Sequence, residues 1–231
     1  MANPLLDGVY IRIGWTSEHI RTLKNMQRSI EKIDPDTVAI KGESEVNINA
    51  EGNTEIITPW FDFGEPISDP AWSRELGYTV YNLRASLDYL VYALAFLDSG
   101  SEKKGTQFPI CSNPSQFKKS VKRGLLRGVN PTHKAAIEAL QPYNGGNWLK
   151  ELAGLSNPDK HMHLSTVASQ NLMRTLRVST AFDAETQTRT MNMELDATRF
   201  IAFPDSTPVI PLLNTLETQI TDTVNQFAPD F

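Results

Sequence analysis

The feature that most constrains this chain is a heptad repeat of apolar residues between positions 70 and 99. The spacing of the repeat alternates between four and three positions over three heptads. An apolar residue every 3.5 positions forms one seam along a helix, and the seam is buried when the helix packs against others at a shallow angle. Asp69-Pro70 is a suitable helix start and Ser99-Gly100 a suitable end. The seam residues are Leu76, Val80, Leu83, Leu87, Leu90, Leu94 and Leu97.

Apolar stripes predict further helices at about 10–33, 131–170 and 211–228. Thr16 or Ser17 can cap the first of these, because their hydroxyls suit a helix N-terminus. Together with the heptad helix, these stripes predict an antiparallel helical bundle.

Alternating apolar and polar residues predict antiparallel strands at about 37–60 and 174–205. In the second region the alternation predicts several short strands. The expected fold is therefore mainly α, of the α+β class, with a small antiparallel β-sheet added to the bundle. We expect a single domain over residues 1–231.

Composition excludes several classes of protein. The chain has 231 residues, 40% of them hydrophobic, and a net charge of -5, which excludes global disorder and a protein that coats nucleic acid uniformly. The single cysteine, Cys111, excludes an intrachain disulfide and a cysteine-based zinc site. The longest uncharged apolar run, 89–97, is too short to span a bilayer. We therefore expect a cytoplasmic protein with no membrane partner.

The charges are unevenly distributed. Residues 34–75 hold ten acids and two bases, whereas residues 103–134 hold eight bases and no acid. The basic segment can form a patch that steers RNA, or it can dock on the protein's own acidic region. Its candidate RNA-binding residues are Lys118, Lys119, Lys122 and Arg123.

A first polar cluster lies beside the apolar seam. Tyr81, Arg84, Asp88 and Tyr92 follow one another at spacings of 3, 4 and 4, which places them in one strip of the helix. One interpretation is an exposed Arg–Asp pair that contributes about 0.2–0.5 kcal/mol. The other is a half-buried pair that orients a ligand phosphate.

A second polar cluster covers residues 157–163. Its start suits a new helix, with an asparagine as N-cap and a proline in the first turn, where exposed N–H groups favour anions. Its two histidines are two positions apart and point to different sides of a helix, so we predict no metal ion there. The candidate side chains are Asn157, Asp159, Lys160 and His161.

Two motifs resemble a family of uncharacterised bacterial and phage proteins. Residues 82–90 match its N-L-R-x-x-L-D-x-L helix, and residues 155–161 contain its N-x-D-K-H motif. The family's intervening F-P-I and Q-P-Y stand at 108–110 and 141–143. The resemblance covers roughly residues 13–165.

The first motif also resembles the Arg-x4-His signature of the HEPN superfamily, which are antiparallel helical domains that include metal-independent ribonuclease toxins and phage-defence nucleases. Arg84 matches the arginine, Tyr89 stands in place of the histidine, and Tyr92 matches a tyrosine that follows the histidine in some members. The resemblance implies a HEPN-like bundle that acts as a homodimer on RNA without a metal or other cofactor, and an operon-encoded protein partner.

Two hypotheses about function follow from these residues. In the first, the protein binds or cleaves RNA: Arg84 stabilises the phosphate, His161 serves as acid or base in place of the missing histidine, and Asp88 and Lys160 support them. Asn82, Tyr89, Tyr92, Asn157 and Asp159 would then help to bind the RNA.

The alternative hypothesis is a non-catalytic binding or assembly module. Arg84, Asp88, Asp159 and His161 would then form a structural polar network between helices, and such networks fix the register of a bundle. Tyrosine, with an ordinary pKa of about 10, is a poor general base near neutral pH, so the residue at position 89 favours this alternative.

Overall fold

The computed structural model describes residues 4–33, 38–49, 52–161, 167–183 and 188–231. Along this described chain, six α-helices accompany four strands, and the strands form two separate antiparallel two-stranded sheets. The chain is therefore mainly helical and of the α+β class, as the sequence predicts. The elements are α1 (Asp7–Glu31), β1 (Ala39–Asn49), β2 (Gly52–Asp62), α2 (Pro70–Ser99), α3 (Pro114–Lys122), α4 (Pro131–Ala139), α5 (Asn147–His161), β3 (Ala168–Asp183), β4 (Thr188–Ala202) and α6 (Val209–Phe227).

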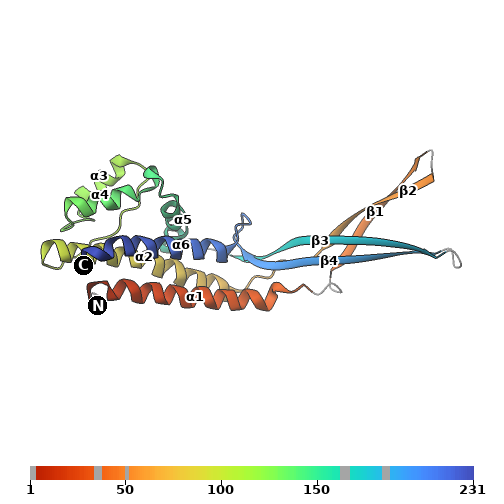
Figure 1. Cartoon of the computed structure of the whole chain (residues 1–231), viewed down its shortest axis with the longest axis horizontal. Coiled ribbons are helices and arrows are strands. Elements are labelled where there is room, and N and C mark those ends of the chain that lie inside the picture. Colours follow the sequence, from red (N-terminus) through yellow and green to blue (C-terminus); the bar gives the residue numbers. More distant parts are fainter. Residues whose placement is uncertain (1–3, 34–37, 50–51, 162–166, 184–187) are drawn as a thin grey trace.

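The helices and the strands occupy different halves of the molecule. Helices α1, α2 and α6 run side by side along the long axis, and α5 packs against α2 and α6 (Figure 1). Helices α3 and α4 lie at one end of this bundle, whereas the hairpins β1–β2 and β3–β4 extend from the other end (Figure 1). The short 3-10 turns are η1 (Pro4–Leu6), η3 (Pro142–Asn144) and η4 (Ala228–Asp230).

The heptad helix is the most buried element of the bundle, and its predicted bounds are confirmed. The Asp69 carboxylate accepts a hydrogen bond from the backbone N–H of Ala71 and caps the start of α2. Gly100 ends the helix with a φ of 67°, which glycine adopts without strain. All seam residues except the last, Leu97, are at most 2% exposed. The seam therefore faces the other helices, as its spacing predicts.

The start of the first helix differs from its prediction. Helix α1 begins at Asp7, because the buried residues Leu6 and Val9 extend the apolar stripe upstream. Thr16 and Ser17 are therefore not caps. Both lie inside α1, and their hydroxyls donate to carbonyls four residues earlier, at 3.0 and 3.2 Å.

The helical stretch predicted at 131–170 is interrupted. Helix α4 ends at Ala139, α5 begins only at Asn147, and the chain is already in β3 by Ala168. Gly146 makes the turn before α5. A Cβ atom there would lie 1.7 Å from the backbone oxygen of Leu140, so only glycine fits this close approach.

Two prolines lie inside helices rather than before them. The prediction that a helix restarts at Asn157 is wrong, because α5 runs without a break through Pro158 to its end. Pro158 removes one helical hydrogen bond, and burial of Leu149 and Leu152 in the core stabilises the helix around this gap. Pro211 lies in the first turn of α6, where backbone N–H groups have no acceptor within the helix. A proline there removes no helical hydrogen bond.

The strands are longer than the predicted short segments. Both predicted β regions form hairpins, but they are two separate sheets and not one. The alternating segments between 174 and 205 join into a single hairpin of strands 16 and 15 residues long. Its register places Leu176 opposite Leu195 and Val178 opposite Met193.

The tight turn before α5 leads to a first prediction. Gly146→Ala should destabilise the protein by at least about 2 kcal/mol, because the new methyl group meets backbone that cannot move away. Gly154→Ala is the matched control: a Cβ there meets nothing within 4 Å, and alanine favours a helix over glycine by about 1 kcal/mol. Urea unfolding of both variants measures the difference. Equal stabilities would contradict the close approach at Gly146.

Candidate functional site

The Arg84–Asp88 pair holds a backbone segment against α2. Arg84 Nη2 lies 3.1 Å from Asp88 Oδ1 and donates a 2.5 Å hydrogen bond to the carbonyl oxygen of Phe108. The N–H of Phe108 in turn donates to Asp88 Oδ1 at 2.8 Å. The two side chains thus bind both backbone polar groups of one buried residue, Phe108. We call this arrangement the Arg84–Asp88 clamp.

The clamp is buried rather than exposed. The side chain of Arg84 is 12% exposed, so the interpretation as an exposed surface pair is wrong. Burial lowers the pKa of Arg84 from its ordinary value, and the charge of Asp88 acts in the opposite direction. Arg84 Nη1 is also buried, and among the described residues it has no hydrogen-bond partner. A guanidinium in this position is directed into the protein and not toward solvent.

An arginine of the first helix is surrounded by exposed aromatic rings. The Arg12 guanidinium carbon lies 5.0 Å from the ring centre of Trp15, 5.5 Å from that of Tyr81 and 5.2 Å from that of Tyr89. These distances permit cation–π attraction. Arg12 Nη1 donates to Asn82 Oδ1 at 3.0 Å, which orients the guanidinium. The three rings are 46%, 57% and 42% exposed.

A glycine lets the two helices approach at this point. A Cβ atom on Gly8 of α1 would lie 2.6 Å from Cδ1 of Tyr89, so the tyrosine ring lies directly on the backbone of α1. Tyr89 stands where the HEPN signature has histidine, and here it has a clear packing role. It joins α1 to α2 while one side of its ring stays in solvent.

Two cavities meet at Tyr89 and Asp88. The smaller, of about 210 Å³, is also lined by Tyr81, Arg84 and Ser156. The larger, of about 410 Å³, is lined by Tyr92 of α2 and by residues 103–106 of the following loop. Rings and cations thus continue from α1 along α2 to this loop. We call this surface the aromatic–cationic face; it comprises Arg12, Trp15, Tyr81, Tyr89, Tyr92, Lys103 and Lys104.

Sequence reasoning found only part of this face. The sequence predicts Tyr81, Tyr89 and Tyr92, and also Asn82, which orients Arg12 from beside the face. It does not predict Arg12 or Trp15. The pair has an i, i+3 spacing on α1, but its meeting with the tyrosines depends on how α1 packs against α2.

The second motif lies beside the first in the bundle. Ser156 of α5 lines the same cavity as Arg84, so the helices that carry the two motifs are neighbours. The predicted anion site at a helix start is wrong, because α5 begins at Asn147 and not at the motif. The side chains of Asn157, Asp159, Lys160 and His161 lie outside the described residues, and so does His163.

In the part of the chain that the structure describes, the basic segment does not dock on the acidic one. Figure 1 places the β1–β2 hairpin, which carries much of the acidic region, at the opposite end of the molecule from α3. The predicted residues Lys118, Lys119, Lys122 and Arg123 lie on α3 or at its C-cap, and all four are exposed.

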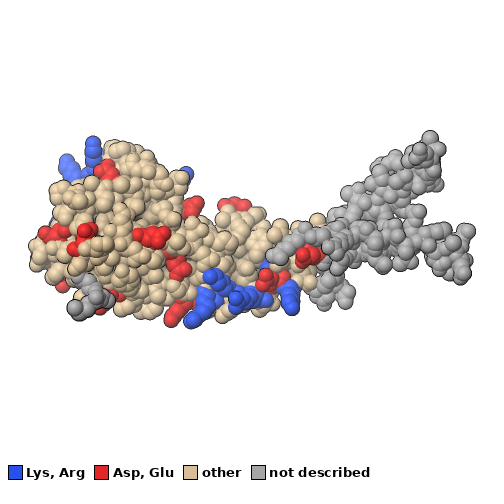
Figure 2. Space-filling view, in the orientation of Figure 1, with Lys and Arg blue, Asp and Glu red and all other residues tan. Residues whose placement is uncertain are grey.

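Basic side chains are also exposed elsewhere. Lys and Arg groups gather at the end of the bundle that carries α3 and α4, and along the edge where α1 lies (Figure 2). Arg21 and Arg28 of α1 are exposed, and so is its C-cap, Lys32. Arg21 is nine positions, or two and a half helical turns, after Arg12. The two arginines therefore point to opposite sides of α1.

A buried histidine that the sequence reasoning missed ties the C-terminus to the bundle. His133 Nδ1 lies 2.8 Å from Asp98 Oδ2, and His133 Nε2 lies 3.2 Å from Asp230 Oδ2. Asn130 also binds Asp98, through its backbone N–H at 2.7 Å and its side chain at 2.8 Å. Because carboxylates face both ring nitrogens, we assign this cluster a structural role and not that of a general base.

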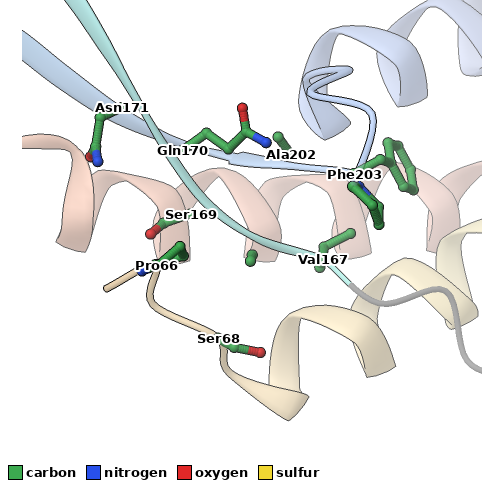
Figure 3. Close-up of a pocket in the computed structure, with 10 residues that line it drawn as sticks. Pro66, Ser68, Val167, Ser169, Gln170, Asn171, Ala202 and Phe203 are labelled. Atoms are coloured by element: carbon green, nitrogen blue, oxygen red, sulfur yellow. The ribbon is translucent and has the colours of Figure 1, made fainter. Parts of the chain in front are cut away.

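A further cavity lies where the β3–β4 hairpin joins the bundle (Figure 3). It has a volume of about 410 Å³, and the described residues that line it carry no ionisable side chain. Ser169 is bound to Ile67 twice, through its N–H and through its hydroxyl oxygen, both at 2.8 Å. This cavity therefore offers little chemistry compared with the aromatic–cationic face.

Within the described part of the chain, no three His, Cys, Asp or Glu side chains come together to hold a metal ion. None of the helices in the described ranges is both long enough and apolar enough to cross a bilayer.

Comparison of the chain with known protein families, curated proteins and solved structures finds no match. The resemblance of residues 13–165 to other proteins therefore rests on the quoted motifs. The functional proposal below rests on the geometry of the aromatic–cationic face.

The Arg84–Asp88 clamp leads to a second prediction. Arg84→Met should lower the free energy of unfolding by about 1–3 kcal/mol, because it takes from the Phe108 carbonyl its hydrogen bond to Arg84 and from Asp88 its ion pair. Asp88→Asn should lower it too, and the double variant should lose less than the sum of the two. Urea unfolding measures all three. Strictly additive losses would contradict a shared clamp.

The histidine cluster leads to a third prediction. His133→Ala should cost about 1–3 kcal/mol, since it leaves the buried Asp98 carboxylate with one partner fewer. Asp230→Asn should cost less than about 1 kcal/mol, because that carboxylate is half exposed. Thermal unfolding of both variants compares the losses. A larger loss for Asp230→Asn would show that the C-terminal contact dominates instead.

Proposed function

We propose that this protein binds single-stranded RNA on the aromatic–cationic face. The supporting observation is the position of Arg12 among the exposed rings of Trp15, Tyr81 and Tyr89. Aromatic rings stack on unpaired bases, each worth about 1–3 kcal/mol, and arginine binds phosphates and stacks on bases. A face that alternates rings and cations matches the alternation of bases and phosphates along a strand.

The charge on this face also favours a polyanion. Lys103 and Lys104 extend it beyond Arg12. Two acids lie beside the face: Asp88 is held by the clamp, and Glu102 by its hydrogen bond with Tyr92. Exposed rings that are close to one another commonly mark a binding surface. The bases of RNA can stack on these rings, and its phosphates can bind these cations.

Catalysis stays a prediction of the HEPN resemblance. Nη2 of Arg84 already donates to Phe108, and this contact favours the alternative hypothesis that the pair is structural. Cleavage of RNA further requires an acid or base within hydrogen-bond reach of the reacting oxygen, and His161 is the sequence candidate. A homodimer, an operon-encoded partner and a cytoplasmic location also stay predictions.

Binding of a labelled RNA oligonucleotide tests the proposal as a fourth prediction. Fluorescence anisotropy should give a Kd that rises about 5- to 100-fold in Tyr81→Ala, since one stacked base is lost. Arg12→Ala should weaken binding by at least about fivefold and reduce the salt dependence. Arg21→Ala is the matched control: it removes the same charge from the opposite side of α1 and should change the Kd by less than about twofold.

Several results would overturn the proposal. One is the absence of measurable RNA binding at low salt. A second is an equal loss of RNA affinity in Arg12→Ala and Arg21→Ala. A third is a Tyr81→Ala protein that changes from dimer to monomer in light scattering while its RNA affinity stays the same, because the face would then join two copies of the chain. Gel analysis of the same RNA, with and without EDTA and in His161→Ala, tests cleavage separately.

A further inference from the structure

The cavity at the loop end of the aromatic–cationic face has two lysines in its wall. Lys103 and Lys104 both line it. The aliphatic part of Lys103 packs on Gly128, where a Cβ atom would lie 2.8 Å from the lysine Cγ. Lys103 Nζ donates to Ser101 Oγ at 2.7 Å, which uses one of the three N–H donors of an ammonium group. Lys103 is therefore held in a fixed position with donors to offer a ligand.

The other wall of the cavity is aromatic. Tyr89 and Tyr92 line it, and both rings are partly exposed. Desolvation, and then the charge of Glu102 and a hydrogen bond to it, raise the pKa of Tyr92 above its ordinary value. The phenol therefore stays neutral near pH 7, and Glu102 orients the ring. A flat neutral ring beside two ammonium groups suits a base and its phosphate.

We propose that this cavity binds the phosphorylated end of an RNA strand. The terminal base lies against Tyr89 and Tyr92, and the terminal phosphomonoester lies against Lys103 and Lys104. The volume of about 410 Å³ is in the range of small-molecule sites. This inference rests on the proposed RNA binding and deepens it, because it names the part of the RNA that is recognised.

The two lysines of the cavity favour the phosphorylated end of an RNA strand over its internal phosphates. An internal phosphodiester carries one negative charge, whereas a phosphomonoester carries about 1.5 to 2 at pH 7, because its second pKa is near 6. Two ammonium groups in one cavity therefore match a terminal phosphate better than an internal one. Two carboxylates lie at the cavity. Asp88 is held by Arg84 and Phe108, and Glu102 by its hydrogen bond with Tyr92, so both compete less with a phosphate.

Competition between RNA oligonucleotides of one sequence is the fifth prediction and tests the inference. The oligonucleotides carry a 5′-phosphate, a 3′-phosphate or hydroxyls at both ends. One phosphorylated form should bind at least about fivefold more tightly than the hydroxyl form at about pH 7.5. Since the second proton binds near pH 6, this preference should shrink at about pH 5. The two phosphorylated forms show which end enters the cavity.

Paired lysine variants identify the cavity as the source of the preference. Lys103→Gln/Lys104→Gln should abolish the preference for a phosphate while hydroxyl-ended RNA still binds. Lys32→Gln/Lys150→Gln is the control: it removes the same charge from exposed positions outside the cavity and should keep the preference. RNA that binds equally well with and without an end phosphate overturns this inference but leaves the proposed function intact. A preference that survives in Lys103→Gln/Lys104→Gln also overturns it. No RNA binding at all overturns both.

Discussion

Burial of the α2 seam is the interaction on which the rest of the structure depends. Helices α1, α5 and α6 all pack against α2, and the seam residues between Leu76 and Leu94 are almost completely removed from water. Each buried leucine contributes about 1.5–3 kcal/mol, so the seam supplies much of the driving force for assembling the bundle. The other helices take their positions from this contact.

The same helix also provides the binding surface. Because a heptad seam occupies one side of a helix, the residues beside it lie at the edge of the buried zone. Tyr81, Tyr89 and Tyr92 fall there and stay partly in solvent. Their rings are fixed by the packed helix beneath them, and a rigid platform loses little conformational entropy when a ligand binds.

Buried polar groups in this protein hold segments in place. The Arg84–Asp88 clamp fixes the chain at Phe108, and this position directs the preceding loop toward Tyr92. The histidine cluster similarly joins α2, α4 and the C-terminus. The clamp therefore shapes the aromatic–cationic face without being part of it. Motif residues that resemble a catalytic signature can thus act by positioning their neighbours.

The sequence by itself determined the helix of residues 70–99, its capped ends and the strip of Tyr81, Arg84, Asp88 and Tyr92, because these depend on local spacing and local hydrogen bonds. It did not determine the partners of that strip. Only the packing of α1 on α2 brings Arg12 to the tyrosines, and only the fold of the loop brings Lys103 to Tyr92. Contacts between segments distant in the chain leave no periodic signal, so the tertiary structure decided which charges meet which rings.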